Sequence, residues 1–209
     1  MADSCSSAQI ITPVGPARTL TEGPPAGATL VLGHGAGGGI HAPDLLAARD
    51  AALAVGLRVV RVEQPWRVSG RRVAEAAARL DVAWTAVLGG LEGPVVVGGR
   101  SAGARVACRT ATATGAVAVL ALAFPLRPPG CPERTRLPEL LAPDVPRLVV
   151  QGDRDAFGVP QPASGVDLHV VAGADHAFAV RRADGRTAAQ VAAEVRAVVA
   201  AWLGRLSYP

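Results

Sequence analysis

The sequence predicts a single α/β domain in which a mainly parallel sheet carries helices on both faces. Short runs of β-branched and aliphatic residues alternate with Ala-rich stretches along the chain, which is typical of repeated strand–helix units. Most of these runs are apolar without interruption, as expected of strands buried on both sides. The expected strands lie at residues 29–32, 58–62, 94–98, 117–121, 147–151 and 167–171.

Length and composition agree with one domain. A chain of 209 residues can enclose a substantial core, and with 50% hydrophobic but only 3% aromatic residues that core must consist of Ala, Val and Leu. Residues 1–27 are rich in Pro and Gly, and we expect them to form an N-terminal segment with one or two edge strands at most. The α/β domain itself is expected over residues 28–209.

Three helices have readable boundaries. Pro43 suits the first turn of a helix that Gly56 ends. Apolar residues at helical spacing predict a second helix over 73–87. A capping box at Thr187-Ala-Ala-Gln predicts the start of the last helix, which runs to Gly204.

The composition excludes several function classes. The chain contains no Lys, which excludes a Schiff-base lysine, a phosphate-loop lysine and a Ser–Lys dyad. Its net charge of +4 comes from scattered arginines without aromatic neighbours, so a nucleic-acid partner is not expected. We expect neither a membrane span, which would need about 18 apolar residues, nor a secretory signal. Cys5, Cys108 and Cys131 lack metal or redox spacing, which predicts a reduced, cytoplasmic setting.

The strongest functional signal is a G-x-S-x-G pattern at residues 99–103, directly after a run of valines. Its glycines allow a strand and a helix to approach closely, while Ser101 is held in a tight turn with its hydroxyl exposed. A serine at this place could also be a simple helix cap. The position between a predicted strand and a predicted helix favours a nucleophile.

A second glycine-rich stretch, Leu32-Gly-His-Gly-Ala-Gly-Gly-Gly, follows the first clear strand. In a serine hydrolase this place supplies one backbone N–H of the oxyanion hole, and the residue after the nucleophile supplies the other. We expect Ala36 and Ala102 in these roles, and a structural role for His34. A phosphate-binding loop is the alternative, but neither G-K-[ST] nor G-x-G-x-x-G spacing supports it.

An acid and a histidine follow two later strands, at Asp155 and His176. Because parallel strands end at the same edge of a sheet, we expect these side chains to meet there. The chain order Ser101, Asp155, His176 is that of the α/β-hydrolases. Asp153 lies as close to its strand end, yet the two further residues before Asp155 let the chain turn towards the histidine loop.

Four segments, LGHGAGG, GGRSAGAR, QGDRDAFG and GADHAF, resemble the dienelactone-hydrolase-like branch of the α/β-hydrolases. More closely, the chain looks like the small bacterial hydrolases related to the testis-expressed and chromatin-complex subunit proteins of that superfamily, over about residues 28–205. The resemblance implies an α/β-hydrolase fold, a Ser-His-Asp triad with Asp155 as the acid, and no metal or organic cofactor. Ser101 stands where dienelactone hydrolase has a cysteine, so lactone specificity is not implied.

These features predict a serine hydrolase that acts on a small carboxylic ester or thioester through an acyl-enzyme. Two alternatives stay open, namely a cofactor-free perhydrolase with the same triad and a non-catalytic interaction module of the same fold. The intact Ser, Asp and His favour an enzyme over the module.

The surroundings of the site are less defined. Seven prolines between residues 124 and 146 predict a stiff, irregular excursion with one short helical turn around 138–141. The interval is too short for the cap that many α/β-hydrolases carry, so we expect a minimal core and an open site. Arg100 could attract an acidic substrate or form an ion pair with Glu63. Candidate wall residues are Trp66, Phe124, Leu126 and Phe157.

Overall fold

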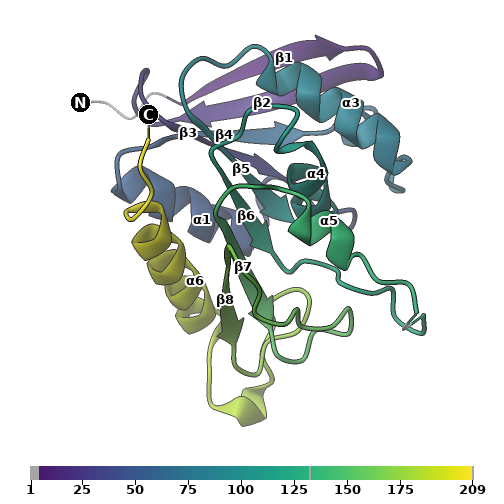
Figure 1. Ribbon diagram of the computed structural model, residues 1–209, viewed down its shortest axis with the longest axis vertical. Helices are drawn as coiled ribbons and strands as arrows, with labels where there is room; N and C mark the ends of the chain where they lie inside the picture. Colours follow the sequence, from purple (N-terminus) through teal and green to yellow (C-terminus); the bar gives the residue numbers. More distant parts are fainter. Residues whose placement is uncertain (1–4, 132, 209) are drawn as a thin grey trace.

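A single eight-stranded sheet runs through the computed structural model, which describes residues 5–131 and 133–208 (Figure 1). The strand order is β1-β2-β4-β3-β5-β6-β7-β8. The strands are β1 (Ser6–Thr12), β2 (Gly15–Glu22), β3 (Thr29–Gly33), β4 (Arg58–Glu63), β5 (Val95–Arg100), β6 (Ala118–Leu122), β7 (Arg147–Gly152) and β8 (Val166–Val171). The helices are α1 (Pro43–Ala54), α2 (Pro65–Val68), α3 (Ala77–Leu88), α4 (Ala102–Thr110), α5 (Leu137–Leu141), the 3₁₀ turn η1 (Arg182–Asp184) and α6 (Ala188–Leu203).

The strands from β3 to β8 are parallel, and they are the six strands that the sequence predicts. The hairpin of β1 and β2 extends the sheet on one side, where β2 pairs antiparallel with β4. β3, β6 and β7 are buried along their whole length, whereas β8 forms the opposite edge and is half-exposed. The predicted mainly parallel sheet is confirmed, and the N-terminal segment contributes β1 and β2, of which β1 is the edge strand.

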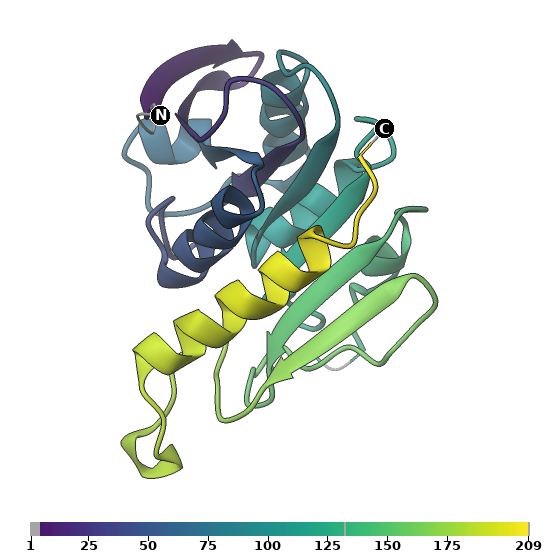
Figure 2. The same cartoon turned by 90° about the vertical axis from the view of Figure 1, so that its left-hand side faces the viewer.

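Helices cover both faces of the sheet. Leu30 and Leu32 of β3 point to the face covered by α1 and α6, and Val31 points to the opposite face, because side chains alternate along a strand. α1 and α6 pack side by side, while α3, α4 and α5 lie across the sheet from them (Figures 1 and 2). Aliphatic and Ala side chains dominate both layers of the core, as the composition requires. None of the described helices is long and apolar enough to cross a membrane.

One helix is shorter than its apolar spacing predicts. α3 begins at Ala77, and Val73, which continues the helical spacing, lies in the preceding loop with 80% of its surface exposed. The carboxylate of Glu75 pairs with Arg71 and with Arg79, which holds this loop in place outside the helix.

The proline-rich stretch between β6 and β7 forms an irregular loop with one short helix, α5, at the expected place. Glu139 of α5 fastens the loop to α4, because its carboxylate accepts hydrogen bonds from Arg105 at 2.6 and 2.8 Å and from Arg109 at 3.1 Å. Arg109 also binds Asp81 of α3. No separate cap domain is present in the described part of this stretch.

This charged cluster makes an acid-stability prediction. Burial raises the pKa of Glu139, but the hydrogen bonds and charges of Arg105 and Arg109 outweigh it, so the net pKa lies below the ordinary value of 4.5. A carboxyl group whose pKa is lower in the folded than in the unfolded protein stabilises the fold above its ordinary pKa and loses that effect as the pH falls. We expect Glu139→Gln to lower the free energy of unfolding by about 1 kcal/mol at neutral pH, with the difference vanishing well below pH 4.5.

Urea unfolding of both proteins across the acid range measures this difference. Glu133→Gln is the matched control, because Glu133 lies exposed in the same loop. Equal urea midpoints for the wild type and the Glu139 variant at neutral pH would contradict the prediction.

Candidate active site

Ser101 lies at the sharp turn between β5 and α4. Its backbone has φ 53° and ψ −109°, a conformation that residues other than Gly rarely adopt. The Ser101 N–H donates to the carbonyl oxygen of Leu122 on β6 at 2.9 Å, which holds the strained turn in place. The turn positions the serine hydroxyl above the carboxyl edge of the sheet.

Two glycines make this turn possible. A Cβ atom on Gly99 would lie 2.4 Å from the carbonyl oxygen of Gly33, and one on Gly103 would lie 2.3 Å from the same oxygen. Both distances are far below van der Waals contact, so any side chain at either position would push β3 away from the turn. The G-x-S-x-G spacing therefore has a direct steric cause here.

The carboxylate of Asp155 is held by three donors. Its Oδ2 accepts from His176 Nδ1 and from Gln151 Nε2, both at 2.7 Å, and its Oδ1 accepts from the Phe157 N–H at 2.8 Å. The side chain is fully buried. A buried carboxylate with this many donors has a fixed orientation and stays available as an acceptor.

Gln151 is a site residue that the sequence analysis missed. Its amide Nε2 donates to Asp155 and also approaches the carbonyl oxygens of Phe124 at 3.2 Å and Gly158 at 3.0 Å. The side chain thereby links the acid to the backbone on both sides of it. The signal in the sequence is a glutamine at the end of an otherwise apolar, buried strand.

Asp153 has a different environment from Asp155. It is exposed, and its Oδ1 accepts from the Gly173 N–H at 2.8 Å. Next to it, the Arg154 N–H donates to the carbonyl oxygen of Ala174 at 3.0 Å. Asp153 therefore helps to bind the loop after β7 to the loop after β8, and it does not contact the histidine ring.

His176 joins the acid to the serine. Its Nδ1–H donates to Asp155, and its Nε2 accepts from the Ser101 hydroxyl at 2.9 Å. Asp175 shapes the turn that presents the ring, because its Oδ1 accepts from two backbone N–H groups further along the loop. The ring also packs against Phe157, with centroids 4.3 Å apart and planes inclined by 40°.

The glycine-rich stretch lies directly beside Ser101. A Cβ atom on Gly35 would lie 3.4 Å from the Cβ of Ser101, which places the next residue, Ala36, close to the serine. The N–H groups of Ala36 and Ala102 have no hydrogen-bond acceptor among the described residues, and Ala102 opens α4, where amides lack an intrahelical partner. Both amides are thus free to bind an oxygen on a substrate.

His34 holds the glycine-rich stretch in place through hydrogen bonds on both nitrogen atoms of its ring. Its Nε2 accepts from the Gln64 N–H at 3.1 Å and its Nδ1–H donates to the Gly35 carbonyl oxygen at 2.8 Å. Burial lowers its pKa, against smaller opposing effects of the Gly35 carbonyl and Glu63. His34 therefore stays neutral and structural, in contact with the protein backbone on both ring nitrogens.

Arg100 does not pair with Glu63, which corrects one of the two expectations for this residue. Its Nε lies 3.0 Å from Asp44 Oδ2, at the start of α1. Glu63 is bound instead by Arg18, which lies directly opposite it in the antiparallel pairing of β2 and β4. Side chains directly opposite each other on neighbouring strands lie within contact distance, so Glu63 pairs with Arg18 and not with Arg100.

The four candidate wall residues fall into two groups. Phe157 lies half-buried against His176, next to the triad. Trp66, Phe124 and Leu126 are buried in the core on the α3–α4 side of the sheet, and Trp66 packs against the ring of His34. An aromatic residue near a strand end was expected to line the substrate site. Of the three aromatic residues, Trp66 and Phe124 instead pack in the hydrophobic core.

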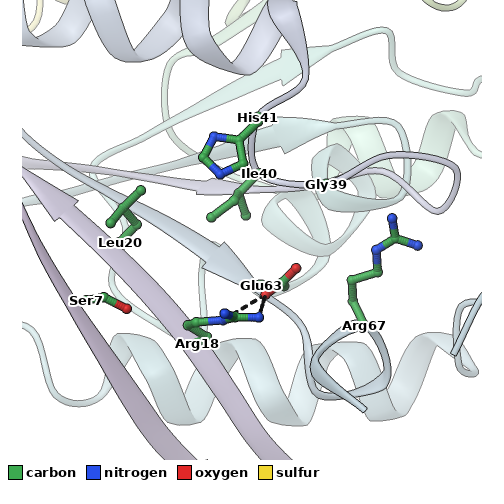
Figure 3. A pocket seen from close by; sticks show the side chains of 8 residues that line it. All are labelled: Ser7, Arg18, Leu20, Gly39, Ile40, His41, Glu63 and Arg67. Atoms are coloured by element: carbon green, nitrogen blue, oxygen red, sulfur yellow. Dashed lines mark hydrogen bonds and ion pairs between the residues drawn. The ribbon is translucent and has the colours of Figure 1, made fainter. Parts of the chain in front are cut away.

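Two open hollows flank the turn at residues 39–41. One, of about 450 Å³, is lined by the glycine-rich stretch, the start of α1, Arg100 and Ala177. The other, of about 370 Å³, lies towards the hairpin, where the Arg18–Glu63 pair faces Arg67 across the opening (Figure 3). Ser101 and His176 are not among the residues that line these two hollows, but their neighbours Arg100 and Ala177 line the first one, and the His176 side chain keeps 24% of its surface exposed.

The arrangement provides the groups that acyl transfer requires. It combines a hydroxyl hydrogen-bonded to an imidazole, a carboxylate that orients the imidazole, and two free amides near the hydroxyl. Within residues 5–131 and 133–208, no group of three His, Cys, Asp or Glu side chains is placed to hold a metal ion.

Comparison with known proteins agrees with this architecture. An alpha/beta serine hydrolase homologue from Coxiella burnetii superposes with a TM-score of 0.74 at 21% identity, covering 95% of this chain and 97% of its own. A lidless serine hydrolase from Xanthomonas campestris gives 0.73 at 19%, covering 98% and 97%. An esterase from Pyrobaculum calidifontis gives 0.65 at 16%, covering 96% and 85%.

No curated protein matches the sequence. The family model described as an alpha/beta hydrolase domain matches residues 26–204, which is most of the chain. The protein therefore belongs to the alpha/beta hydrolase domain family.

Proposed function

We propose that this protein is a serine hydrolase that cleaves small carboxylic esters or thioesters through an acyl-enzyme. The observation that carries the proposal is the continuous hydrogen-bond chain from Ser101 through His176 to Asp155, with distances of 2.9 and 2.7 Å. The motifs around these residues also favour a place in the dienelactone-hydrolase-like branch, with serine as the nucleophile.

In the first step, the Ser101 oxygen attacks the carbonyl carbon of the substrate while His176 Nε2 takes the hydroxyl proton. Asp155 keeps the proton of the neutral ring on Nδ1 and stabilises the imidazolium that forms. The N–H groups of Ala36 and Ala102 bind the negative oxygen of the tetrahedral intermediate. The alcohol or thiol then leaves with the proton from His176, and the acyl group remains on the serine.

In the second step, water attacks the acyl-enzyme. His176 accepts a proton from the water and returns it to the serine oxygen as the acid is released. The His176 side chain is 24% exposed, which gives water access to the ring. The proposed substrates are small because the neighbouring hollows are open and offer little enclosed apolar surface.

A fluorophosphonate probe tests the nucleophile. We expect the probe to modify Ser101 covalently, since activated serine hydroxyls attack phosphorus as they attack carbonyl carbon. Ser101→Ala should abolish both labelling and ester hydrolysis, while Ser164→Ala, a change in a remote loop, should leave both intact. Mass spectrometry of the folded protein that finds no label would instead support a non-catalytic module, and a label on another residue would overturn Ser101 as the nucleophile.

The identity of the acid is tested by two substitutions. Asp155→Asn leaves the imidazole without its orienting carboxylate and should lower kcat by roughly 10⁴-fold, as the corresponding substitution does in serine proteases. Asp153→Asn weakens one surface hydrogen bond to Gly173 and should cost about 1 kcal/mol of stability with little effect on turnover. Melting temperatures measured beside kcat separate the two effects. A folded but inactive 153 variant would show that the assignment is wrong.

Acyl-chain preference is tested with a series of p-nitrophenyl esters from acetate through butyrate and octanoate to laurate. We expect kcat/KM to be highest for acetate or butyrate. Each buried methylene adds about 0.8 kcal/mol, and an open site cannot bury the added carbons of a long chain. A clear optimum at laurate would contradict the open site and would require an enclosed acyl tunnel.

A further inference from the structure

The side chain of Arg100, directly before the proposed nucleophile, contacts three separate parts of the site. Its Nε lies 3.0 Å from Asp44 Oδ2, and its Nη2 donates to the carbonyl oxygen of His176 at 3.0 Å. Its Nη1 lies against the glycine-rich stretch, since a Cβ atom on Gly35 would be 3.2 Å away from it. Only 13% of the side chain is exposed, so the guanidinium is packed among these groups.

Asp44 is the counter-ion in this arrangement. It lies in the first turn of α1, where the helix N-terminus favours a negative charge, and its side chain is only 3% exposed. Burial raises its pKa, and the charge of Arg100, the backbone N–H groups of Asp44 and Leu45, and the charge of His176 reduce that rise without cancelling it. The ion pair is thus a buried one that solvent does not screen.

The loop that carries His176 is held by contacts with neighbouring segments in addition to its own turn at Asp175. Beyond β8 it contains only the short 3₁₀ turn η1 before α6 begins. From the side of the acid, the Gly173 N–H and the Ala174 carbonyl oxygen are bound to the loop after β7. On the other side, next to Ser101, Arg100 donates a hydrogen bond to the backbone carbonyl oxygen of His176 itself.

We propose that Arg100 is a positioning residue that, anchored by Asp44, holds the His176 loop and the glycine-rich stretch at a fixed distance from Ser101. This role rests on the proposed function. Nε forms an ion pair with Asp44, Nη2 donates to His176, and Nη1 faces the glycine-rich stretch, so each of the three nitrogen atoms contacts another part of the protein. Its effect on the reaction therefore passes through the 2.9 Å contact between His176 and Ser101.

Substitutions of Arg100 test the positioning role. Arg100→Met removes both contacts and should lower kcat by about 10- to 100-fold, as a displacement of the order of 1 Å does in other active sites. KM should stay within about threefold, because the change leaves the substrate-facing groups in place. Arg100→Lys should be intermediate, since one ammonium group can face Asp44 but cannot reproduce the planar fork. Arg196→Met, an exposed arginine on α6, is the matched control and should have wild-type kinetics.

A pH profile gives a readout that a merely structural role would not move. The groups that face His176 are Asp155, Arg100 and Asp44, with Asp175 next to it in the chain. Asp44→Asn leaves the positive charge of Arg100 uncompensated, which disfavours the protonated imidazole. Because His176 must be unprotonated to accept the serine proton, we expect kcat/KM to rise with pH, and in Asp44→Asn this rise should lie at lower pH than in the wild type. The Asp44→Asn, Arg100→Met double variant removes both charges, so the rise should return to the wild-type pH while kcat stays low.

Three results would overturn the role. Wild-type kcat in the Arg100→Met variant, even with a lower melting temperature, would show that the residue only stabilises the fold. A higher KM confined to esters that carry a carboxylate would make Arg100 a substrate contact. An unshifted pH profile in Asp44→Asn would show that the Arg100–Asp44 pair does not act on His176. This variant also tests the positioning role if the Arg100 variants fail to fold.

Failure of the proposed function itself would give a different experimental result. In that case the wild-type protein itself shows neither fluorophosphonate labelling nor ester hydrolysis, and the positioning role fails with it. If the wild type is labelled and active while Arg100→Met behaves like the Arg196 control, only the positioning role is overturned.

Discussion

The contact between the end of β3 and the serine turn is the constraint on which the rest of the site depends. The Gly33 carbonyl oxygen lies so close to Gly99 and Gly103 that neither position has room for a Cβ atom. This contact fixes the position of Ser101 relative to the end of β3. The glycine-rich stretch begins at the same place, so it lies beside the serine. The proposed nucleophile and the proposed oxyanion donor therefore share one steric origin.

A similar contact fixes the other half of the site. A Cβ atom on Gly152 would lie 2.3 Å from the carbonyl oxygen of Ala174, so the loops after β7 and β8 pass each other as closely as the backbone allows. Asp155 and His176 extend from these two loops and meet above the contact. Two glycine-dependent crossings, one between β3 and the turn after β5 and the other between the ends of β7 and β8, thus bring together three side chains that are far apart in the chain. Arg100 connects the two halves through its contacts with Gly35 and His176.

Much of this could be predicted from the sequence, because the relevant signals are local. Apolar runs between helical stretches predicted the six parallel strands, and the motifs at the strand ends named Ser101, Asp155 and His176, which the structure places within hydrogen-bond distance of one another. The partner of Arg100 could not be predicted in this way. Asp44 lies on a helix that follows a different strand, and nothing in the spacing of the two residues records their contact.

Other features were hidden for the same physical reason. Trp66 and Phe124 lie close to strand ends in the sequence, yet whether an aromatic ring faces a site or fills the core depends on packing across the sheet. Gln151 looked like the last residue of a buried strand, and its three hydrogen-bond acceptors come from segments before and after that strand. Tertiary contacts of this kind leave only the residue type, a polar side chain in an apolar run, as a trace in the sequence.

The loop between β6 and β7 has a consequence for the timing of turnover. Its prolines restrict the backbone, Glu139 fastens α5 to α4, and Arg136 binds the carbonyl oxygen of Pro125 within the loop. These contacts fix α5 and join the two ends of the loop before it, so we expect no opening and closing of α5. In many enzymes such gating motions, on the microsecond to millisecond scale, limit the rate. In the proposed reaction, ligand entry and product escape need no such motion, which leaves bond making and breaking as the slow events.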